Sequence, residues 1–482
     1  MSDPGTRPDV HLRINGERIA TGSGGVHGHV NPSTGEVDAK VPLAGPEEVE
    51  RAVQAAHEAF PAWRALPPGE RRRMLLALAD ALEAQQAELA LRGTMDVGTP
   101  AGIVGGMVAI AIEWTRYYAG LADKVTGETT TSYSGGVGEL GFTVPQPYGV
   151  IGMITTWNAP IVSLAMKVPA ALAAGNTVVL KPSELAPFTA ELFADCVEAA
   201  GIPAGVVNVV PGDAAAGAAL VAHPLVEKVS FTGGPATAKK ILGACAELLK
   251  PTVMELGGKS ANIVFDDADL DAAIGYGVFM SIGVMSGQGC LFPTRMLVQR
   301  GVYDDVLARV ELIASMISVG DPFDAASIAG PVISEDALQR VLGMVERAQA
   351  DGARLVCGGG RIGETGYFVQ PTVLADVDPA SELAQQEVFG PVLAITPFDT
   401  EEEAVQIANS TAYGLSGYVQ TRDLKRGLRV AEQLRTGEVL VNGAQSLRPQ
   451  RPFGGLGLSG FGKEGGRAGL EEFQRHLSIA IA

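Results

Sequence analysis

The chain has 482 residues, of which 46% are hydrophobic and 19% are charged. This length exceeds one ordinary core and predicts two or three domains, and the composition is typical of soluble globular proteins rather than disordered or fibrous ones. The formal net charge of −18 argues against a general nucleic-acid or anionic-membrane binder, because attraction to phosphate requires a basic surface.

The four cysteines, Cys196, Cys245, Cys290 and Cys357, are widely spaced and form no CxxC motif. Neither a disulfide framework nor a zinc site is indicated, so we expect no metal and a reducing compartment, the cytoplasm. The first residues lack the apolar core of a signal peptide. The uncharged stretch 140–166 is interrupted by prolines and polar residues, which predicts a strand, a loop and a helix start rather than a membrane span.

The first predicted element in chain order is a hairpin, because two apolar runs flank the turn dipeptide Asn15-Gly16. Helical spacing of apolar residues then predicts helices over 46–60, 69–92 and 99–122. Between 125 and 144 the composition shifts to Thr, Ser and Gly with loose alternation, which predicts a projecting hairpin. An exposed hairpin is an aggregation risk unless it is paired, so we expect an oligomer contact there.

From residue 149 onward, short β-branched runs alternate with helical patterns. The first series predicts strands at 150–154, 177–180, 206–210 and 226–231 and helices at 161–174, 190–200 and 236–249. The second predicts strands at 261–265, 296–298, 353–356, 392–395, 416–419 and 439–441 and helices at 302–317, 335–350 and 402–409. This alternation predicts an α/β fold with parallel sheets covered on both faces. The tail, 477–481, is a short apolar strand that could pair with the hairpin of a neighbouring subunit.

Two stretches indicate covalent chemistry. Ser286-Gly-Gln-Gly-Cys290 places a single cysteine in a glycine-flanked turn, and Glu255 ends a short apolar strand. A thiolate attacks carbonyl carbon and a carboxylate can activate water, so the pair suits acyl chemistry. On local sequence alone, a lone cysteine is more often an inert small hydrophobe.

Phosphate-binding patterns were compared next. Ser230-Phe-Thr-Gly-Gly234 is a strand that ends in glycines before a helix, where backbone N–H groups and the positive helix end would face a diphosphate. The pair Lys181 and Glu184 offers a cation and a carboxylate for sugar hydroxyls, although a solvated turn explains it equally well. The segment 455–460 fits GxGxxG but follows no strand, and Gly258-Lys-Ser260 lacks the first glycine of a P-loop, so both nucleotide readings fail.

Seven ordered motifs, from about residue 31 to the C-terminus, resemble the aldehyde dehydrogenase superfamily. They are Thr156-Trp-Asn158, Lys181-Pro-Ser-Glu184, Phe231-Thr-Gly233, Glu255-Leu-Gly-Gly-Lys259, Gly287-Gln-Gly-Cys290, Glu387-Val-Phe-Gly-Pro391 and Pro452-Phe-Gly-Gly455. The resemblance implies two parallel-sheet α/β domains with a β-hairpin oligomerisation arm, in a homodimer or homotetramer. It assigns 1–124 and 145–254 to an NAD-binding domain, 255–440 to a catalytic domain, 125–144 and 465–482 to the arm and tail, and 441–464 to an active-site loop region that returns toward the cofactor domain.

The resemblance also implies residue roles. Cys290 would be the nucleophile, Asn158 and the Cys290 amide would hold the oxyanion, Glu255 would activate water, and Lys167 and Glu464 would relay protons. Lys181 and Glu184 would bind the adenosine ribose, Thr232 and Gly234 would lie by the diphosphate, Glu387 would hold the nicotinamide ribose, and Phe389 would pack near the nicotinamide. The other implied cofactor residues are Ile154, Thr155, Trp157, Ser183, Phe231, Gly233, Leu256 and Gly257. We expect NAD rather than NADP, because the Glu184 carboxylate would repel a 2′-phosphate.

Departures from the family pattern concern the cofactor and the substrate. Gly234 replaces a usual serine and Ala238 a usual glycine in the diphosphate segment. Ala159, Met166 and Leu447 stand where relatives often carry aromatic residues, and Leu291 and Phe453 complete the implied substrate wall. We therefore expect a wide apolar tunnel for a medium to large, apolar or aromatic aldehyde. Arg448 and Arg451 in the same loop keep an anionic substrate open, although solvated loop charges explain them better.

The expected activity is oxidation of an aldehyde to a carboxylic acid through a Cys290 thiohemiacetal and a thioester that water hydrolyses. Two alternatives stay open at this point. One is a cysteine thioesterase or esterase without redox chemistry, and the other is a non-catalytic structural protein on the same scaffold.

Overall fold

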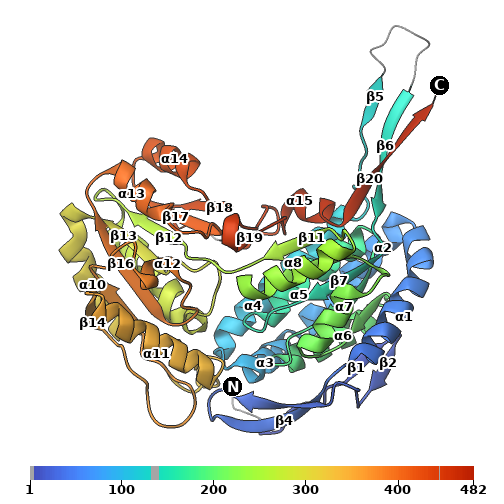
Figure 1. The fold of residues 1–482 in the computed structure, drawn as a ribbon, viewed down its shortest axis with the longest axis horizontal. Helices are drawn as coiled ribbons and strands as arrows, with labels where there is room; N and C mark the ends of the chain where they lie inside the picture. The colour runs from blue at the N-terminus through green and yellow to red at the C-terminus, as the bar shows by residue number, and fades with distance from the viewer. Residues whose placement is uncertain (1–4, 132–139, 444–445, 482) are drawn as a thin grey trace.

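The computed structural model describes residues 5–131, 140–443 and 446–481, and it forms two lobes with a projecting arm (Figure 1). The first lobe is built on an eight-stranded sheet of order β19-β11-β10-β7-β8-β9-β1-β2. The second lobe is built on a seven-stranded sheet of order β14-β15-β16-β13-β12-β17-β18. Helices pack on both sheets, which confirms the predicted α/β fold class.

The first lobe contains most of the chain up to residue 255. Its sheet strands are β1 (Leu12–Ile14), β2 (Glu17–Ile19), β7 (Val150–Ile154), β8 (Thr177–Lys181), β9 (Val207–Val209), β10 (Val226–Thr232), β11 (Thr252–Glu255) and β19 (Gly460–Phe461), and a separate hairpin joins β3 (Val26–Asn31) to β4 (Glu36–Pro42). Its helices are α1 (Pro46–Ala65), α2 (Pro68–Ala84), α3 (Gln86–Val97), α4 (Ala101–Leu121), α5 (Pro160–Ala173), α6 (Pro187–Ala199), α7 (Ala214–Ala222), α8 (Pro235–Glu247) and α15 (Gly466–Glu471). Strands β7 to β11 are parallel, so their carboxyl ends meet at one edge of the sheet.

The second lobe follows β11 directly. Its strands are β12 (Ala261–Val264), β13 (Arg295–Gln299), β14 (Arg354–Cys357), β15 (Thr372–Ala375), β16 (Val392–Phe398), β17 (Ser416–Gln420) and β18 (Glu438–Val441). Its helices are α9 (Leu270–Val278), α10 (Tyr303–Ser315), α11 (Glu335–Ala350), α12 (Glu382–Gln385), α13 (Glu401–Ala408) and α14 (Leu424–Gln433). All neighbouring pairs in this sheet are parallel except β14 with β15.

The predicted elements are largely present, with identifiable exceptions. The single helix expected over 69–92 is two helices, because Gln85 leaves helical geometry (φ −99°, ψ 13°) and ends α2 before α3 begins. No predicted strand or helix corresponds to β3, β4, β15, β19, α7, α12, α14 or α15. Helix α7 reads Ala-Ala-Ala-Gly-Ala-Ala-Leu-Val-Ala, which has no alternation of apolar and polar residues for a periodicity argument to detect.

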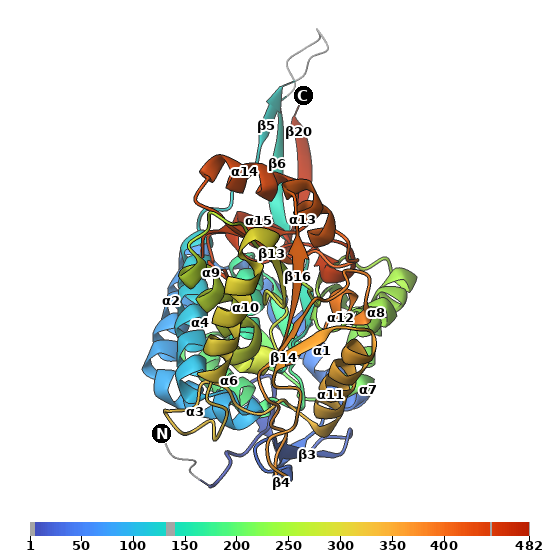
Figure 2. The ribbon, with the colours of Figure 1, turned by 90° about the vertical axis from the view of Figure 1, so that its left-hand side faces the viewer.

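The arm is a three-stranded sheet of β5 (Thr129–Thr131), β6 (Leu140–Pro147) and β20 (Gln474–Ile481) that projects from the first lobe (Figures 1 and 2). The tail strand β20 pairs antiparallel with β6 of its own chain, from Gln474 opposite Pro147 to Ile481 opposite Leu140. The tail thus pairs with the hairpin of its own chain and is an edge strand of this sheet, and its pairing with a neighbouring subunit stays a prediction. The remainder of the predicted hairpin, 132–139, lies outside the described residues.

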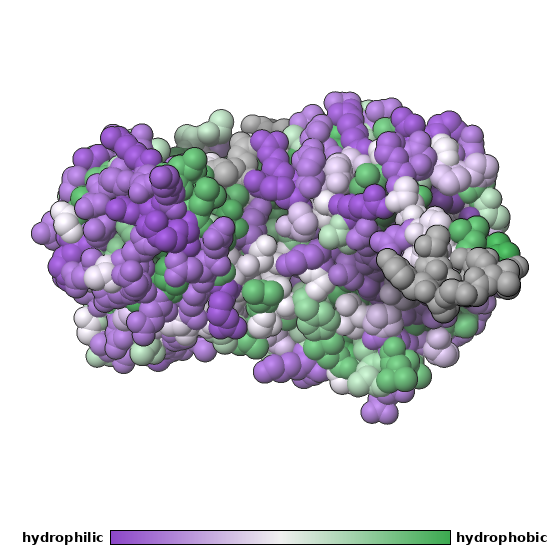
Figure 3. Space-filling model, turned by 90° about the horizontal axis from the view of Figure 1, so that it is seen from above, coloured by the Kyte–Doolittle hydropathy of each residue, from purple (hydrophilic) through white to green (hydrophobic). Residues whose placement is uncertain are grey.

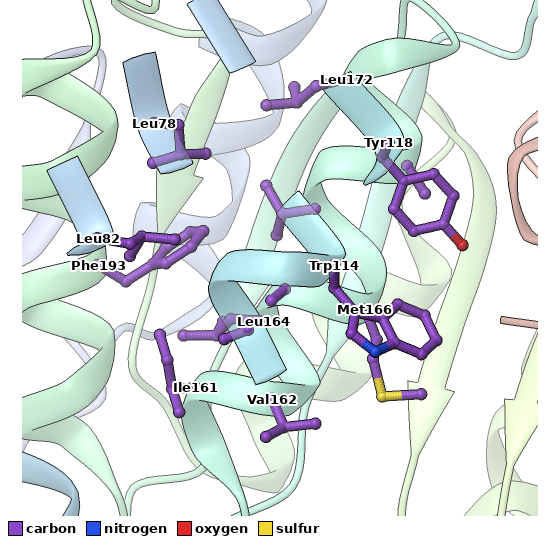
Figure 4. Close-up of a cluster of buried hydrophobic side chains, with 14 of the residues drawn as sticks. Leu78, Leu82, Trp114, Tyr118, Ile161, Val162, Leu164, Met166, Leu172 and Phe193 are labelled. Carbon is purple, nitrogen blue, oxygen red and sulfur yellow. The ribbon is translucent and has the colours of Figure 1, made fainter. Parts of the chain in front are cut away.

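The largest buried cluster joins α2, α4, α5 and α6 beneath the first sheet (Figure 4). In Figure 4, Leu78 and Leu82 of α2 and Phe193 of α6 lie on one side of α5, whereas Trp114 of α4 lies close to Met166. Every residue of α5 is buried. Burying a large apolar side chain contributes about 1.5–3 kcal/mol, so this cluster holds α4 and α5 as a rigid wall.

The surface seen from above is mostly hydrophilic, with hydrophobic residues in small groups (Figure 3). Within the described part of the chain, one helical stretch, Leu270–Gly287, is long and apolar enough to cross a membrane by length and composition. Of that window, 61% is buried inside the fold, and buried core helices meet the same criteria.

Candidate active site

Two cavities meet at Cys290. The first cavity, of about 950 Å³, lies at the carboxyl ends of β7, β8, β10 and β11. The second cavity, of about 740 Å³, lies beside α4 and α5. Five residues line both cavities, namely Thr156, Asn158, Thr232, Glu255 and Cys290. A thiol, a carboxylate and an amide thus stand where two binding spaces join, which is the arrangement expected when one ligand reacts with another.

The turn before Cys290 has an unusual backbone. Met285 and Ser286 both adopt the left-handed region (φ 52° and 50°), and Gly287 follows at φ 72°. Non-glycine residues in this region cost about 1–3 kcal/mol each and cluster at functional sites. A Cβ on Gly287 would lie 2.1 Å from the Gly390 carbonyl oxygen, so only glycine fits there. The Ser286 hydroxyl anchors the turn by donating to the Gly330 carbonyl at 2.7 Å.

Asn158 is fixed against this turn from the other side. Its amide nitrogen donates to the Gln288 carbonyl at 2.8 Å, and its side-chain oxygen accepts from the Thr156 hydroxyl at 2.9 Å. Gln288 is held in turn, because its side-chain oxygen accepts from the Ile333 backbone N–H at 2.9 Å. The second amide hydrogen of Asn158 is therefore available, beside Cys290, to a developing oxyanion.

The Cys290 thiol holds its proton more tightly than a free thiol does. Burial raises its pKa to about 12, and the carboxylates of Glu387 and Glu255 act in the same direction. Nucleophilic attack by this sulfur therefore requires loss of the thiol proton.

Glu255 ends β11 as a buried carboxylate. Both of its oxygens lack a hydrogen-bond partner among the described residues. Burial, followed by repulsion from Glu464, raises its pKa well above the usual range, whereas Lys167 and Lys463 pull it back. An unpartnered carboxylate with a raised pKa is a better proton acceptor near neutral pH than an exposed one, which suits a general base.

Behind Glu255 lies a buried ion pair. The ammonium of Lys167 on α5 contacts the carboxylate of Glu464, which lies 297 residues away in the sequence, and donates to the Ser230 hydroxyl at 3.0 Å. Lys167 is fully buried and Glu464 is 4% exposed. Because Glu255 responds to both charges, the pair is close enough to influence its protonation.

Every residue predicted to bind the cofactor lines the first cavity. These residues are Ile154, Thr155, Trp157, Lys181, Ser183, Glu184, Phe231, Thr232, Gly233, Gly234, Leu256, Gly257, Glu387 and Phe389. The sequence analysis missed the contribution of α7 and α11, which add Ala214, Gly217, Ala218, Val221, Ala337 and Arg340. Helix α7 was not predicted, so its residues could not be assigned.

Specific contacts shape the first cavity. Glu387 accepts from the Gly258 backbone N–H at 3.0 Å, and burial raises the pKa of this carboxyl to about 7. The rings of Trp157 and Phe389 meet edge to face, with centroids 5.5 Å apart and planes at 89°. Lys181 reaches the carbonyl of Pro182 at 3.1 Å and the carboxylate of Glu184 at 3.5 Å.

The donors in the first cavity fit a dinucleotide. Gly234 is the N-cap of α8 and makes no side-chain cap hydrogen bond, and it lines the cavity with Pro235 and Thr237, so the N-terminal end of this helix borders the cavity. Such a helix end attracts a diphosphate. Lys181 ends strand β8, and Glu184 follows it three residues later; both line the cavity. An ammonium and a carboxylate are the kinds of group that bind ribose hydroxyls. The cavity volume is also within the range of cofactor sites.

The second cavity contains every predicted substrate residue, Ala159, Met166, Leu291, Leu447 and Phe453. Its walls also include one face of α4 and an aromatic group that the sequence analysis did not assign, namely Gly102, Ile103, Gly106, Met107, Ile110, Glu113, Trp114, Tyr276, Phe279 and Phe292. Trp114 ties the wall to the loop, because its indole N–H donates to the Leu447 carbonyl at 2.9 Å. Arg448 lines this cavity as well, whereas Arg451 pairs with Glu438 at 3.2 Å.

Known proteins are similar to nearly the whole chain. The model of the aldehyde dehydrogenase family matches residues 21–479. The chain belongs to the aldehyde dehydrogenase family. It is 42% identical to a betaine aldehyde dehydrogenase of Cereibacter sphaeroides over 94% of this chain and 93% of that protein, and 41% identical to an aldehyde dehydrogenase of Enchytraeus buchholzi over 97% and 95%. The predicted family is therefore confirmed, and the membership supports aldehyde oxidation.

Solved structures of family members share the whole fold. An NAD⁺ complex of an aldehyde dehydrogenase from Bacillus cereus has a TM-score of 0.95 at 38% identity, covering 98% of this chain and 96% of that chain. A structure described as an E. coli NADP-dependent enzyme has a TM-score of 0.95 at 36% identity, covering 100% and 99%. Proteins with this fold thus include one in complex with NAD⁺ and one described as NADP-dependent.

Proposed function

We propose that this family member oxidises an aldehyde to a carboxylic acid with NAD as hydride acceptor, through a covalent intermediate on Cys290. The observation that supports the proposal most is that Cys290, Glu255 and Asn158 line both cavities. An aldehyde in the second cavity and a nicotinamide in the first would then approach the same sulfur.

The chemistry assigned to the residues is as follows. The Cys290 sulfur bonds to the aldehyde carbon as its thiol proton passes to water, which leaves a thiohemiacetal oxyanion. The amide of Asn158 and the backbone N–H of Cys290 donate to this oxygen. NAD, when bound, accepts the hydride of the aldehyde carbon. Glu255 then takes a proton from water, which adds to the resulting thioester and expels the Cys290 thiolate with release of the carboxylic acid. Lys167 and Glu464 would pass the proton on from Glu255.

Pre-steady-state kinetics test the role of Glu255. With Glu255→Gln, a burst of reduced cofactor should survive while steady turnover falls by about 10²–10⁴-fold, because only hydrolysis needs the base. Loss of the burst together with turnover would contradict the role. Cys290→Ala should abolish both phases. A thioesterase would instead hydrolyse esters with no need for NAD, and a structural protein would tolerate both substitutions.

We propose NAD over NADP because Glu184 lines the first cavity beside Lys181. A carboxylate accepts from a ribose 2′-hydroxyl and repels a 2′-phosphate. The ratio of kcat/KM values for the two cofactors tests this, and Glu184→Gln should move the ratio toward NADP. Equal ratios in the wild type and the variant would show that Glu184 does not determine the cofactor preference.

We propose a medium to large, apolar or aromatic aldehyde, since the second cavity holds about 740 Å³ and its walls are mainly apolar. A second candidate is an aldehyde with a quaternary ammonium group. Trp114, Tyr276 and Phe279 line the cavity together with Glu113, and aromatic faces with a carboxylate attract such cations. An aldehyde panel with aliphatic, aromatic, acidic and trimethylammonium members separates the two, with cofactor reduction as the readout.

We also propose that the arm of β5, β6 and β20 mediates a homodimer or homotetramer, and that the protein works in the cytoplasm. Strand β20 is an edge of this sheet and exposes Leu477 and Ile481. Exposed apolar edges of this kind are usually covered by a partner. Sedimentation of the wild type and of Leu477→Lys tests the assembly, and unchanged sedimentation of the variant would contradict the contact.

A further inference from the structure

A small polar pocket lies at the amino ends of β12, β13, β17 and β18, four neighbouring strands of the second sheet. Its volume is about 20 Å³, which suffices for one small ion or water. We call it the Lys259 pocket, and its polar lining is Lys259, Ser260, Arg295, Asn409, Thr411, Tyr413, Ser416, Arg435 and Thr436. Tyr413 also lines the first cavity, so the pocket borders the candidate active site.

Four residues that line this pocket carry a buried polar atom without a partner. The Lys259 ammonium and the hydroxyls of Ser260, Ser416 and Thr436 form no hydrogen bond within the described ranges of the chain. Lys259 is only 2% exposed. A buried polar group without a partner costs about 1–3 kcal/mol, and more for a charged one, so four around one pocket indicate a ligand that accepts hydrogen bonds.

The charge of the pocket is one-sided. Arg295 donates to three neutral acceptors, the carbonyls of Lys259, Ile407 and Ala408, at 2.8–2.9 Å. The residues that line the pocket, all within the described chain, include Lys259, Arg295 and Arg435 but no Asp or Glu. The nearest influence of opposite sign on Lys259 comes from Glu387, which is engaged by the Gly258 N–H and lines the first cavity.

The lowered pKa values of Lys259 and Arg295 agree with a pocket that lacks negative charge. Burial, followed by repulsion from Arg295, lowers the pKa of Lys259 to about 7, and burial lowers the pKa of Arg295 to about 10. Burial without an adjacent counter-ion makes Lys259 lose its proton more readily, whereas a bound anion would stabilise its charged form. Water could satisfy the hydroxyls but would leave the charge uncompensated.

We propose that the Lys259 pocket binds a small monovalent anion, such as chloride, held by the Lys259 ammonium and the hydroxyls of Ser260, Ser416 and Thr436. Lys259 and Ser260 belong to the short segment between β11, which carries Glu255, and β12 of the second sheet. The anion therefore ties the strand of the candidate base to the second lobe. The inference does not depend on the aldehyde or on the cofactor.

Crystallography of the full chain tests occupancy directly. Crystals grown in sodium bromide should give an anomalous difference peak in the pocket, within hydrogen-bond distance of the Lys259 nitrogen. The same crystals of Lys259→Met should lose the peak. Density without an anomalous signal would identify water, and this result would overturn the proposal.

The chloride dependence of the thermal midpoint tests anion binding in solution. At fixed ionic strength, replacing gluconate by chloride should raise the thermal midpoint of the wild type in a saturable way. Ser416→Ala, which removes one hydroxyl and keeps Lys259, should weaken the apparent chloride affinity by about three- to tenfold. Lys259→Met should weaken it by about ten- to a hundredfold, through loss of a charge-assisted hydrogen bond.

The matched control is Lys425→Met, which removes the same charge from an exposed position on α14. This variant should keep the chloride response of the wild type. Equal midpoints in chloride and gluconate for the wild type, or an unchanged response in both pocket variants, would overturn the proposal.

Discussion

Removal of one charge from the buried pair Lys167–Glu464 should lower the free energy of unfolding, whereas removal of both charges should change it little. The substitution Lys167→Met shortens the side chain by one atom, keeps it unbranched and removes its charge. It leaves the Glu464 carboxylate, which is 4% exposed, without its cation, and the Ser230 hydroxyl without its donor at 3.0 Å. Breaking a buried pair by deleting one partner costs about 3–5 kcal/mol, so the free energy of unfolding should fall by this amount.

The double variant Lys167→Met with Glu464→Gln provides the internal control. It leaves no unpaired charge at the site, and neutral replacement of a buried pair is often close to neutral in stability. We expect it to recover most of the loss, so the losses of the two single variants should be far from additive in the double-mutant cycle. Urea unfolding at pH 7 and fixed protein concentration, followed by fluorescence and by far-UV circular dichroism, measures all four proteins.

The same variant tests the link to Glu255. Lys167 lowers the pKa of Glu255, so its loss should raise that pKa further. The base form of Glu255 then appears at higher pH, and the pH profile of thioester hydrolysis should move in the alkaline direction. The burst of reduced cofactor should keep its amplitude. A loss of stability below about 1 kcal/mol for Lys167→Met, or a double variant no more stable than the single one, would refute the reasoning about buried charge.

Three further outcomes are expected. Gly234→Ser should lower the KM for the cofactor by about two- to tenfold, because a serine hydroxyl can cap α8 and reach the first cavity. Gly234 has φ −80° and open space at its Cβ position, so the side chain fits. Gly234→Ala is the control for the added carbon atom. Gly106→Leu should lower kcat/KM for bulky aldehydes by about tenfold or more relative to short ones, while Gly105→Leu on the same helix, outside the second cavity, should change the ratio little. The rate at which iodoacetamide alkylates Cys290 should rise about tenfold per pH unit from pH 7 to 9, since the thiol pKa is raised to about 12. Mass spectrometry of the cofactor-free protein measures this rate, and a plateau below pH 8 would contradict this pKa.

The motif residues could be found from the sequence because they occupy strand ends. Ile154, Lys181, Thr232 and Glu255 each end a parallel strand, and parallel strands bring their carboxyl ends to one edge. A strand pattern followed by polar or glycine residues therefore predicts a position in space as well as a local conformation. The domain boundaries drawn from the same motifs stay predictions, although the change of sheet between β11 and β12 is the arrangement they assume.

The wall of the second cavity could not be predicted in the same way. Ile103, Met107 and Ile110 line this cavity and recur at helical spacing within 99–122, where the pattern predicts only a helix. Helix α4 is apolar on more than one face, since Val104 and Val108 are buried in the core on another side. Periodicity shows that a face is apolar but cannot distinguish a face against the core from a face against a cavity.

No sequence motif predicts the Lys259 pocket. Gly258-Lys-Ser260 fails as a P-loop for lack of the first glycine, and the structure adds a physical reason, because the segment leads into strand β12 instead of a helix. No helix N-terminus is present there to support a nucleotide phosphate. The same lysine and serine nevertheless face two hydroxyls that come from Ser416 and Thr436, more than 150 residues later in the chain. Only the parallel order β13-β12-β17-β18 brings these groups together, so a polar site of this kind follows from sheet topology and leaves no local pattern in the sequence.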